Sequence, residues 1–273
     1  MDGDKDVRPY SSEKEPRLLR WEVRLLLLLS TIAGSVDVIS FLTLKIFAAH
    51  ITGNLVLIAA LIVGGRKPNL DQDLAIPVFI IATATVWLIA KTSGSRGLHL
   101  ARLLLLIQFA LLTAVLVISL QCRPSTSPKG LLFTVDAMTA ISAMACQFAL
   151  LRIIMPNAPS TAVMTGNLSS STLALLDIMW NEPLIAGGKQ RLRKQFTLLL
   201  GFFAGCTAGA ASVLWCGDWA WSLPALLAAV AVSSTPKIAP STASLNQSAK
   251  DGLPLDIESL APRLLNKNPS TAQ

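Results

Sequence analysis

Long runs of apolar residues separated by short polar stretches fill most of the chain. An α-helix needs roughly 20 residues to cross a hydrocarbon core of about 30 Å. Uncharged windows of about that length occur at residues 25–44, 48–65, 74–90, 100–121, 131–151, 162–180, 196–216 and 218–235. The pattern predicts an all-α fold, a polytopic transmembrane helical bundle of about eight hydrophobic segments.

Composition supports this fold class and argues against soluble enzyme chemistry. Of the 273 residues, 52% are hydrophobic and 14% are charged, values that do not fit a soluble domain. His50 and His99 are the two histidines, few for an acid–base relay or a metal cluster. The four cysteines show no C-x-x-C spacing, and hydrolase, zinc-protease and phosphate-loop motifs are missing from the sequence. We expect no enzyme activity, no cofactor and no metal.

The chain ends differ from the apolar middle. Residues 1–24 mix acids and bases, and residues 236–273 are rich in Pro, Ser, Asn and Lys, a composition typical of disorder. We therefore predict a cytoplasmic N-terminal segment at 1–24, a bundle at 25–235 and a disordered tail at 236–273. The net charge of +7 does not indicate nucleic acid, because the basic residues lie between apolar runs without interleaved aromatics.

Tryptophans mark the ends of several predicted segments. Tryptophan prefers the headgroup level of a bilayer. One precedes the first segment, one closes the third, one closes the sixth and three cluster around the last turn: Trp21, Trp87, Trp180, Trp215, Trp219 and Trp221. This placement supports the segment boundaries.

The tetrapeptide Thr-Gly-Asn-Leu occurs twice, beginning at Thr52 and at Thr165, 113 residues apart. A shift of that length places the first four segments near the last four. We therefore predict two repeats, at about 25–121 and 131–235. Such duplication is common among transporters and channels, although it also occurs in membrane proteins that transport nothing.

Lysine and arginine counts predict the orientation but leave two topologies open. With eight crossings, 18 of the 23 basic residues lie on the side of both termini, which the positive-inside rule places in the cytoplasm. Six crossings plus two re-entrant segments, the second and the sixth, give the same count. The first topology makes the repeats parallel and the second makes them inverted. We favour eight crossings because Trp180 would anchor the sixth segment at the far side.

Two stretches resemble the paired signatures of the YoaK-like membrane proteins, a family of unknown function in bacteria and fungi. They are "GSVDVISFLTLKIFAAHITGNLVLIAA" and "AMACQFALLRIIMPNAPSTAVMTGNL". The matching positions are Asp37, His50, Thr52, Gly53 and Asn54 in the first signature and Gln147, Arg152, Thr165, Gly166 and Asn167 in the second. Phe148 stands where the second signature usually has an amide. The resemblance implies an integral membrane fold without an established activity.

Asp37 is the strongest physical signal, because it lies about half-way along the first segment. An ionised carboxylate there costs roughly 2.5 to 3.5 kcal/mol on insertion scales. It is either a proton- or cation-coupling site or a structural hydrogen-bond acceptor. His50 is a candidate titrating partner, with an interfacial position as the alternative.

Asn54 and Asn167 bring amides that need partners into apolar segments. They belong either to a broken-helix substrate site or to a structural lock between the repeats. Hydroxyls follow the second asparagine at Ser169, Ser170, Ser171 and Thr172, so a wet path is expected nearer the second copy. Gln147 completes the candidate path through its place in the second signature. Arg152 either meets an anionic substrate or reaches the headgroups.

Gly201, Gly205 and Gly209 at four-residue spacing predict a smooth face for close helix packing, within the chain or between two copies. Together these features favour a permease or exporter of a small molecule. The alternative is a membrane scaffold or accessory subunit. The expected partners are the lipid bilayer and a small molecule or proton, and the sequence leaves oligomerisation open.

Overall fold

The computed structural model describes residues 14–67, 69–94, 97–121, 130–156, 158–161, 164–180 and 188–235, with side chains of the first helix from Trp21 onward. The predicted tail at 236–273 and the first 13 residues lie outside this part. The elements are α1 (Lys14–Leu44), α2 (Ile51–Val63), α3 (Leu70–Thr92), α4 (Leu98–Gln121), α5 (Leu131–Ile154), α6 (Met164–Met179), α7 (Gly188–Cys216), the 3₁₀ helix η1 (Gly217–Trp221) and α8 (Ser222–Ser234).

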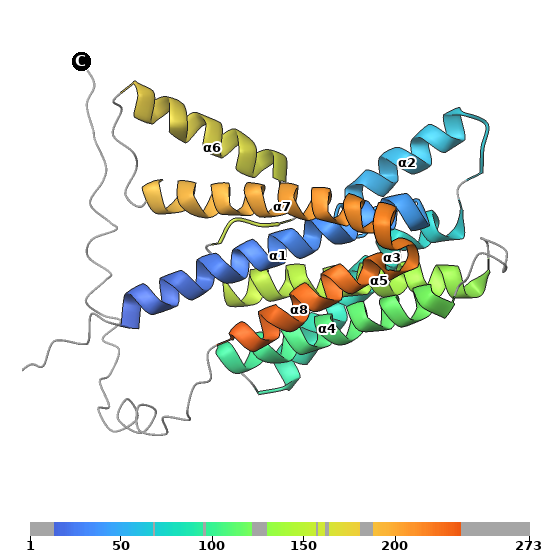
Figure 1. Ribbon diagram of the computed structural model, residues 1–273, viewed down its shortest axis with the longest axis horizontal. Helices are drawn as coiled ribbons and strands as arrows, with labels where there is room; N and C mark the ends of the chain where they lie inside the picture. Colours follow the sequence, from blue (N-terminus) through green and yellow to red (C-terminus); the bar gives the residue numbers. More distant parts are fainter. Residues whose placement is uncertain are drawn as a thin grey trace, which may run out of the picture. The chain divides into compact units, whose positions relative to one another are not determined.

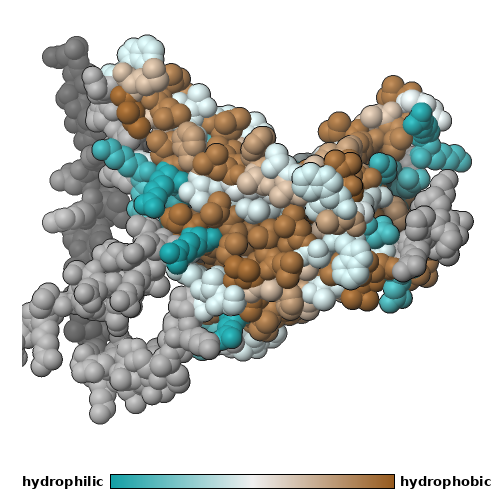
Figure 2. Space-filling view, in the orientation of Figure 1, coloured by the Kyte–Doolittle hydropathy of each residue, from teal (hydrophilic) through white to brown (hydrophobic). Residues whose placement is uncertain are grey.

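The all-helical bundle is confirmed, since each predicted segment overlaps one α-helix (Figure 1). Five helical stretches are long and apolar enough to cross a membrane: Trp21–Leu44, Leu70–Thr92, Leu98–Gln121, Leu131–Ile154 and Gly188–Ser234. The last of these contains α7, η1 and α8. One face of the molecule is accordingly dominated by apolar side chains, with hydrophilic ones gathered toward its ends (Figure 2).

Two helices are too short to join this set. α2 has 13 residues and α6 has 16, which correspond to about 20 Å and about 24 Å of helix, less than the roughly 30 Å of a hydrocarbon core. α8 also has 13 residues, but it continues from the five residues of η1. At about 2 Å per residue for a 3₁₀ helix, the two together reach about 30 Å.

The first short helix returns to the end of the bundle that the chain has just reached. We call the end where α1 begins the proximal end and the end where α1 stops the distal end. The side-chain nitrogen of Gln72, in the first turn of α3, donates to the carbonyl of Lys45, the residue after α1, over 3.4 Å. α3 therefore begins at the distal end where α1 stops, and α2 does not cross.

The second short helix behaves in the same way at the opposite end. Lys91 at the end of α3, Gly97 before α4 and Ile154 at the end of α5 line one cavity, so α5 ends at the proximal end. α7 begins there too, because Lys194 Nζ lies 2.8 Å from Glu22 Oε2 on α1. α6 thus leaves and returns at the proximal end.

These contacts and lengths favour six crossings with two short folded-back helices over the eight crossings expected above. The expectation rested on Trp180 as an interfacial residue. Trp180 is 72% exposed at the end of α6, so it can still lie at an interface, but at the proximal one. A tryptophan at the end of a helix indicates a membrane interface, but it does not indicate which of the two interfaces, because tryptophan is enriched at both.

The glycine face of α7 packs directly on α1. A Cβ added to Gly205 would overlap the Thr31 carbonyl, one on Gly201 would overlap the Ser30 hydroxyl, and one on Gly209 would lie 2.9 Å from the Cα of Ser35. Residue numbers rise together along both helices, so α1 and α7 run parallel. The four-residue spacing of these glycines predicts a close helix contact, and α1 of the same chain provides it.

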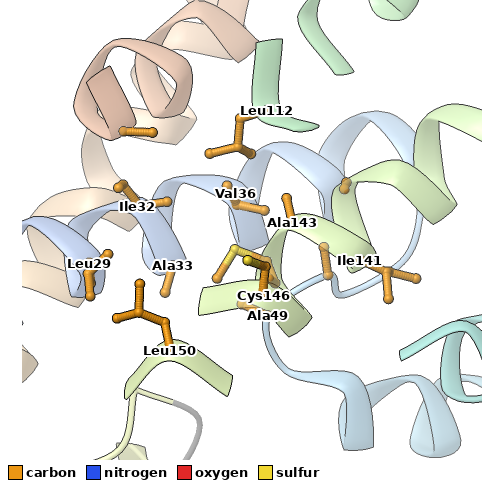
Figure 3. Packing of buried hydrophobic residues seen from close by; sticks show 14 of the residues in the cluster. Leu29, Ile32, Ala33, Val36, Ala49, Leu112, Ile141, Ala143, Cys146 and Leu150 are labelled. Atoms are coloured by element: carbon orange, nitrogen blue, oxygen red, sulfur yellow. The ribbon is translucent and has the colours of Figure 1, made fainter. Parts of the chain in front are cut away.

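The other contacts complete the bundle. α1 also packs on α5 and α8, α3 packs on α5, and α4 packs on α5 and α8, while α2 contacts α3 and α6 contacts α7. Apolar side chains of α1, α4 and α5 meet in the core, together with Ala49 from the loop after α1 (Figure 3). A loop residue in the core is the first sign that this connection enters the bundle.

Candidate functional site

The connection between α1 and α2 turns back along α1. Lys45 has a positive φ of 58°, which reverses the chain directly after the helix. Asp37 Oδ1 then accepts the backbone N–H groups of Ala49 over 2.8 Å and His50 over 3.1 Å. Asp37 precedes the last residue of α1 by seven positions, about 10 Å of helix. The loop therefore retreats by about that distance before α2 begins.

His50 forms the side-chain partner of Asp37. Its Nδ1 lies 2.5 Å from Asp37 Oδ2, and its ring meets Phe202 of α7 edge-on at 5.2 Å between centroids. The histidine side chain is 28% exposed, against 7% for the aspartate side chain. His50 lies in the connection between two helices, and the hydrogen bond to Asp37 raises its pKa above the ordinary value, with burial acting in the opposite direction.

Asn54 fastens the same loop from the side of α2. Its Oδ1 accepts the N–H of Phe47 and its Nδ2 donates to the carbonyl of Phe47, both over 2.8 Å. Ser40 adds a contact from α1, because its hydroxyl accepts the N–H of Ala48 over 3.3 Å. The amide that the sequence places in an apolar segment thus finds backbone partners in the preceding loop.

Asn167 repeats this arrangement in the second half. Its Nδ2 donates to the carbonyl of Ser160 over 2.8 Å, and Ser160 precedes it by seven residues, as Phe47 precedes Asn54. Both asparagines are buried in the first turn of a short helix. These bonds tie each short helix to its own entry loop, which differs from the helix-to-helix lock considered from sequence.

The hydroxyl run on α6 divides between two sides of the helix. Ser171 is buried and donates to Gln195 Oε1 of α7 over 3.4 Å. Ser169 is exposed and donates to the carbonyl of Thr165, and Ser170 is half-buried. The run therefore supplies one polar contact to the bundle and leaves other hydroxyls at the surface.

Gln147 and Arg152 lie apart from the loop residues. Gln147 is fully buried, donates to the Leu29 carbonyl over 2.9 Å and accepts from Gln108 Nε2 over 2.7 Å. Leu29 is eight residues from Asp37, about 12 Å along α1. Arg152 is exposed near the end of α5, at the proximal end. The structure thus brings Asp37, His50 and Asn54 together and separates Asn167, Gln147 and Arg152 from them.

Sequence reasoning missed two contributors. Ser40 lies three residues after Asp37, on the same face of the helix, and this spacing was a usable signal. Gln195 falls one residue before the predicted window at 196–216, so the window search passed over it. The described residues contain no group of three or more His, Cys, Asp or Glu side chains that could hold a metal ion. A carboxylate bonded to an imidazole can hold one proton between them and release it.

Comparison with known proteins gives a family without an activity. Residues 25–234 match the family described as "Protein of unknown function (DUF1275)". No curated protein and no solved structure matches the chain. The match bears out the expectation of an uncharacterised family, while the YoaK-like name stays a resemblance. Because the match covers well over half of the chain, the chain belongs to the DUF1275 family, and its apolar helices make it a membrane protein of unknown function.

Proposed function

We propose that the protein is a small-molecule permease, built from two inverted repeats, with its path beside the two folded-back loops. The observation that carries this proposal is the pair of short helices α2 and α6. Each begins at an entry loop that is bonded to the asparagine in its first turn, and each leads back to the end of the bundle where the chain entered, one distal and the other proximal. Discontinuous helices entering from opposite sides are the usual framework of substrate sites in secondary transporters.

Helix packing supports the repeat. The repeat pairs α1 with α5, α2 with α6, α3 with α7 and α4 with α8. If the two helices of every pair exchange labels, the helix–helix contacts of the bundle map onto one another. The α1–α7 contact becomes α5–α3, α4–α5 becomes α8–α1, and α2–α3 becomes α6–α7, while α4–α8 maps onto itself. With three crossings in each half, the halves have opposite directions in the membrane, which is the inverted arrangement.

The distribution of basic residues supports an orientation with both termini in the cytoplasm. The described part of the proximal end carries Arg24, Lys91, Arg102, Arg152, Lys189, Arg191, Arg193 and Lys194, whereas the described part of the distal end carries Lys45, Arg66 and Lys67. The positive-inside rule then places the proximal end in the cytoplasm. Addition of a sugar to the acceptor site at Asn246 would contradict this orientation.

The Asp37–His50 pair is the proposed proton site of the permease. When the Asp37–His50 pair binds a proton, the net charge of the pair increases by one. This change takes place directly beside the loop and does not need a prior movement of the loop. Loss of that proton removes the positive charge of the imidazolium, which weakens its bond to the Asp37 carboxylate and with it the attachment of the loop to α1. Proton release is thereby linked to the freedom of the loop, which is what proton coupling requires. On this proposal the protein has no enzymatic role and uses no cofactor.

One observation favours a second function, that of a membrane scaffold or accessory subunit. The described partners of Asn54 and Asn167 are backbone groups of the chain itself, and Asp37 already accepts two backbone N–H groups in addition to its bond with His50. Groups satisfied in this way can be wholly structural. A scaffold would retain the same loops and move nothing.

Flux measurements separate the two functions. The protein is reconstituted into vesicles loaded with a pH-sensitive dye and exposed to a panel of amines, organic acids and sugars, with empty vesicles as the baseline. A permease gives substrate-dependent proton movement that Asp37→Asn abolishes. Asp73→Asn is the control, since Asp73 is an exposed acid in the first turn of α3. Signals equal to empty vesicles throughout the panel would favour the scaffold.

A further inference from the structure

A cavity of about 330 Å³ lies at the proximal end, where α5 leads into the loop before α6. It is bordered by the ends of α3 and α5 and by the start of α4. Its walls include Trp87, Lys91, Leu100, Ile153 and Ile154. The cavity thus combines one ammonium group with a mostly apolar lining.

The cation is held over an aromatic ring. Lys91 Nζ lies 5.5 Å from the centroid of the Trp87 ring, within the range of a cation–π contact. Such a contact uses the face of the ring and leaves donors of the ammonium group for an anion. Lys91 is exposed and Trp87 is 55% exposed, so the charged edge of the cavity is accessible from outside.

Two further cations lie within two residues of a lining residue along the chain. Arg102 follows the lining residue Leu100 by two positions, and Arg152 directly precedes Ile153. Both arginines are exposed. The five lining residues named above include no acid, so the local field favours a negatively charged ligand.

The ligand must also be amphiphilic. Leucine and isoleucine walls would not favour free phosphate, which is better hydrated in water. Next to the lining residue Trp87 in the sequence, α3 exposes the large apolar side chain of Leu88 at 54%, a surface suited to an acyl chain. The volume is at the lower end of ligand cavities and suits a headgroup whose chains remain outside.

We infer that this cavity binds the headgroup of an anionic phospholipid, with the phosphate at Lys91 and the acyl chains along the exposed face of α3. Basic pockets between membrane helices on the cytoplasmic side are typical positions for anionic headgroups. Trp87 fits this depth, because tryptophan prefers the membrane interface. Its role is separate from the proposed proton site, since the lining includes residues of α3, α4 and α5, whereas the Asp37–His50 contact lies between α1 and the loop before α2.

The test uses the full chain in a neutral detergent and follows its melting midpoint during titration with phosphatidylglycerol. Phosphatidylcholine with the same acyl chains and inorganic phosphate are the comparison ligands. A ligand that binds the folded state raises the midpoint with concentration. We expect phosphatidylglycerol to raise it, and the other two to leave it nearly unchanged. An equal rise with phosphatidylcholine, or a full rise with phosphate alone, would overturn the proposal.

Variants locate the binding. Lys91→Gln is expected to weaken phosphatidylglycerol binding about fivefold, the usual contribution of one basic residue near an anionic surface. Trp87→Leu keeps the charge but removes the ring, and is expected to weaken binding less. Lys45→Gln at the distal end is the matched control and should bind as the wild type does. Each midpoint is compared with that of the same variant without lipid, so a general loss of stability is not mistaken for a loss of binding. Unchanged binding by Lys91→Gln would contradict the site.

Discussion

The two entry loops of the short helices use the same asparagine and different supports. In the first half, Asp37 and Ser40 of α1 hold the loop. The residues 113 positions later on α5 are Leu150 and Ile153, which have no polar group to offer, and Leu150 is buried in the core. The second loop is nevertheless fastened to its helix by Asn167. A fold-back of this kind therefore does not require a carboxylate, which makes the Asp37–His50 pair harder to explain by structure alone.

A second contrast concerns the two helix pairs that the proposed repeat relates. α1 and α7 meet through glycines, whereas the positions 113 residues before Gly201 and Gly205 are Leu88 and Thr92 of α3. α3 instead meets α5 through larger groups, such as Phe79 and Phe148 with ring centroids 5.9 Å apart. The α1–α7 contact is the closer one, and it fixes the helix that carries Asp37.

The largest loss of stability is expected from filling the α1–α7 contact. In Gly205→Ala the new methyl group meets the backbone of Thr31, which cannot rotate away, so the two helices must separate. We expect a loss of about 3 kcal/mol, at the upper end of overpacking effects. Thermal unfolding in detergent measures it. Ala204→Leu adds more atoms on the exposed face and should change the midpoint little; equal effects of the two variants would contradict the packing argument.

Replacing the carboxylate that distinguishes the first loop is expected to have the next largest effect. Asp37→Leu gives α1 the residue that α5 has at position 150. It leaves the N–H groups of Ala49 and His50 without their acceptor, at roughly 1–3 kcal/mol for each unsatisfied group, but it also removes a carboxylate that is costly in a membrane. We expect a net loss of about 2 kcal/mol in thermal unfolding.

A reporter in the loop separates this effect from general unfolding. A cysteine placed at Ala48, where Ser40 and Asp37 hold the chain, should react with a polar maleimide faster in the Asp37→Leu background. A cysteine at Ala204 should react equally in both backgrounds. No change at position 48 would mean that Asp37 does not restrain the loop.

The two asparagines should have similar effects, no larger than that of Asp37→Leu, because each donates to the carbonyl group seven residues earlier. Asn54→Ala removes two bonds to Phe47 and Asn167→Ala removes the bond to Ser160. At about 1 kcal/mol per hydrogen bond, we expect a loss of about 2 kcal/mol for Asn54→Ala and a loss of the same order for Asn167→Ala in thermal unfolding. Loss of transport with unchanged stability in either variant would show that the amide serves a substrate instead of its loop.

Sequence was sufficient for the positions of the helices because apolar windows and membrane thickness fix them. The window at 48–65 contains α2 at Ile51–Val63, for example. The direction of α2 was not predictable, since it depends on the turn at Lys45 and on the bond from Gln72 to the Lys45 carbonyl. Both lie in short connections where neither hydropathy nor charge counts distinguish a crossing from a return.

The candidate site was predictable in part for a similar reason. A carboxylate inside an apolar segment is costly, so Asp37 was visible from sequence, and His50 was a candidate titrating partner for it. The partners of Asn54 and Asn167 were not visible, because backbone groups seven residues away carry no signature. Gln147 shared the second signature but bonds to Leu29 in another part of the bundle, which shows that a common motif does not imply a common site.

The smallest expected effect is a pH dependence of stability that comes from the first loop. The second loop should have no such dependence, because the residue 113 positions after His50 is Val163. Asp37 of α1 raises the pKa of His50, while α7 presents Phe202 and Cys206 on this side of α1. A histidine with a raised pKa stabilises the folded state fully below its unfolded value of about 6.5, and this contribution is lost as pH rises through the folded pKa. The melting midpoint of the wild type should therefore fall with rising pH above about 6.5 relative to that of His50→Gln. Parallel midpoints for the two proteins from pH 5.5 to 9 would show that the proton on this pair does not support the fold, and the first loop would then be equivalent to the second despite its charged residues.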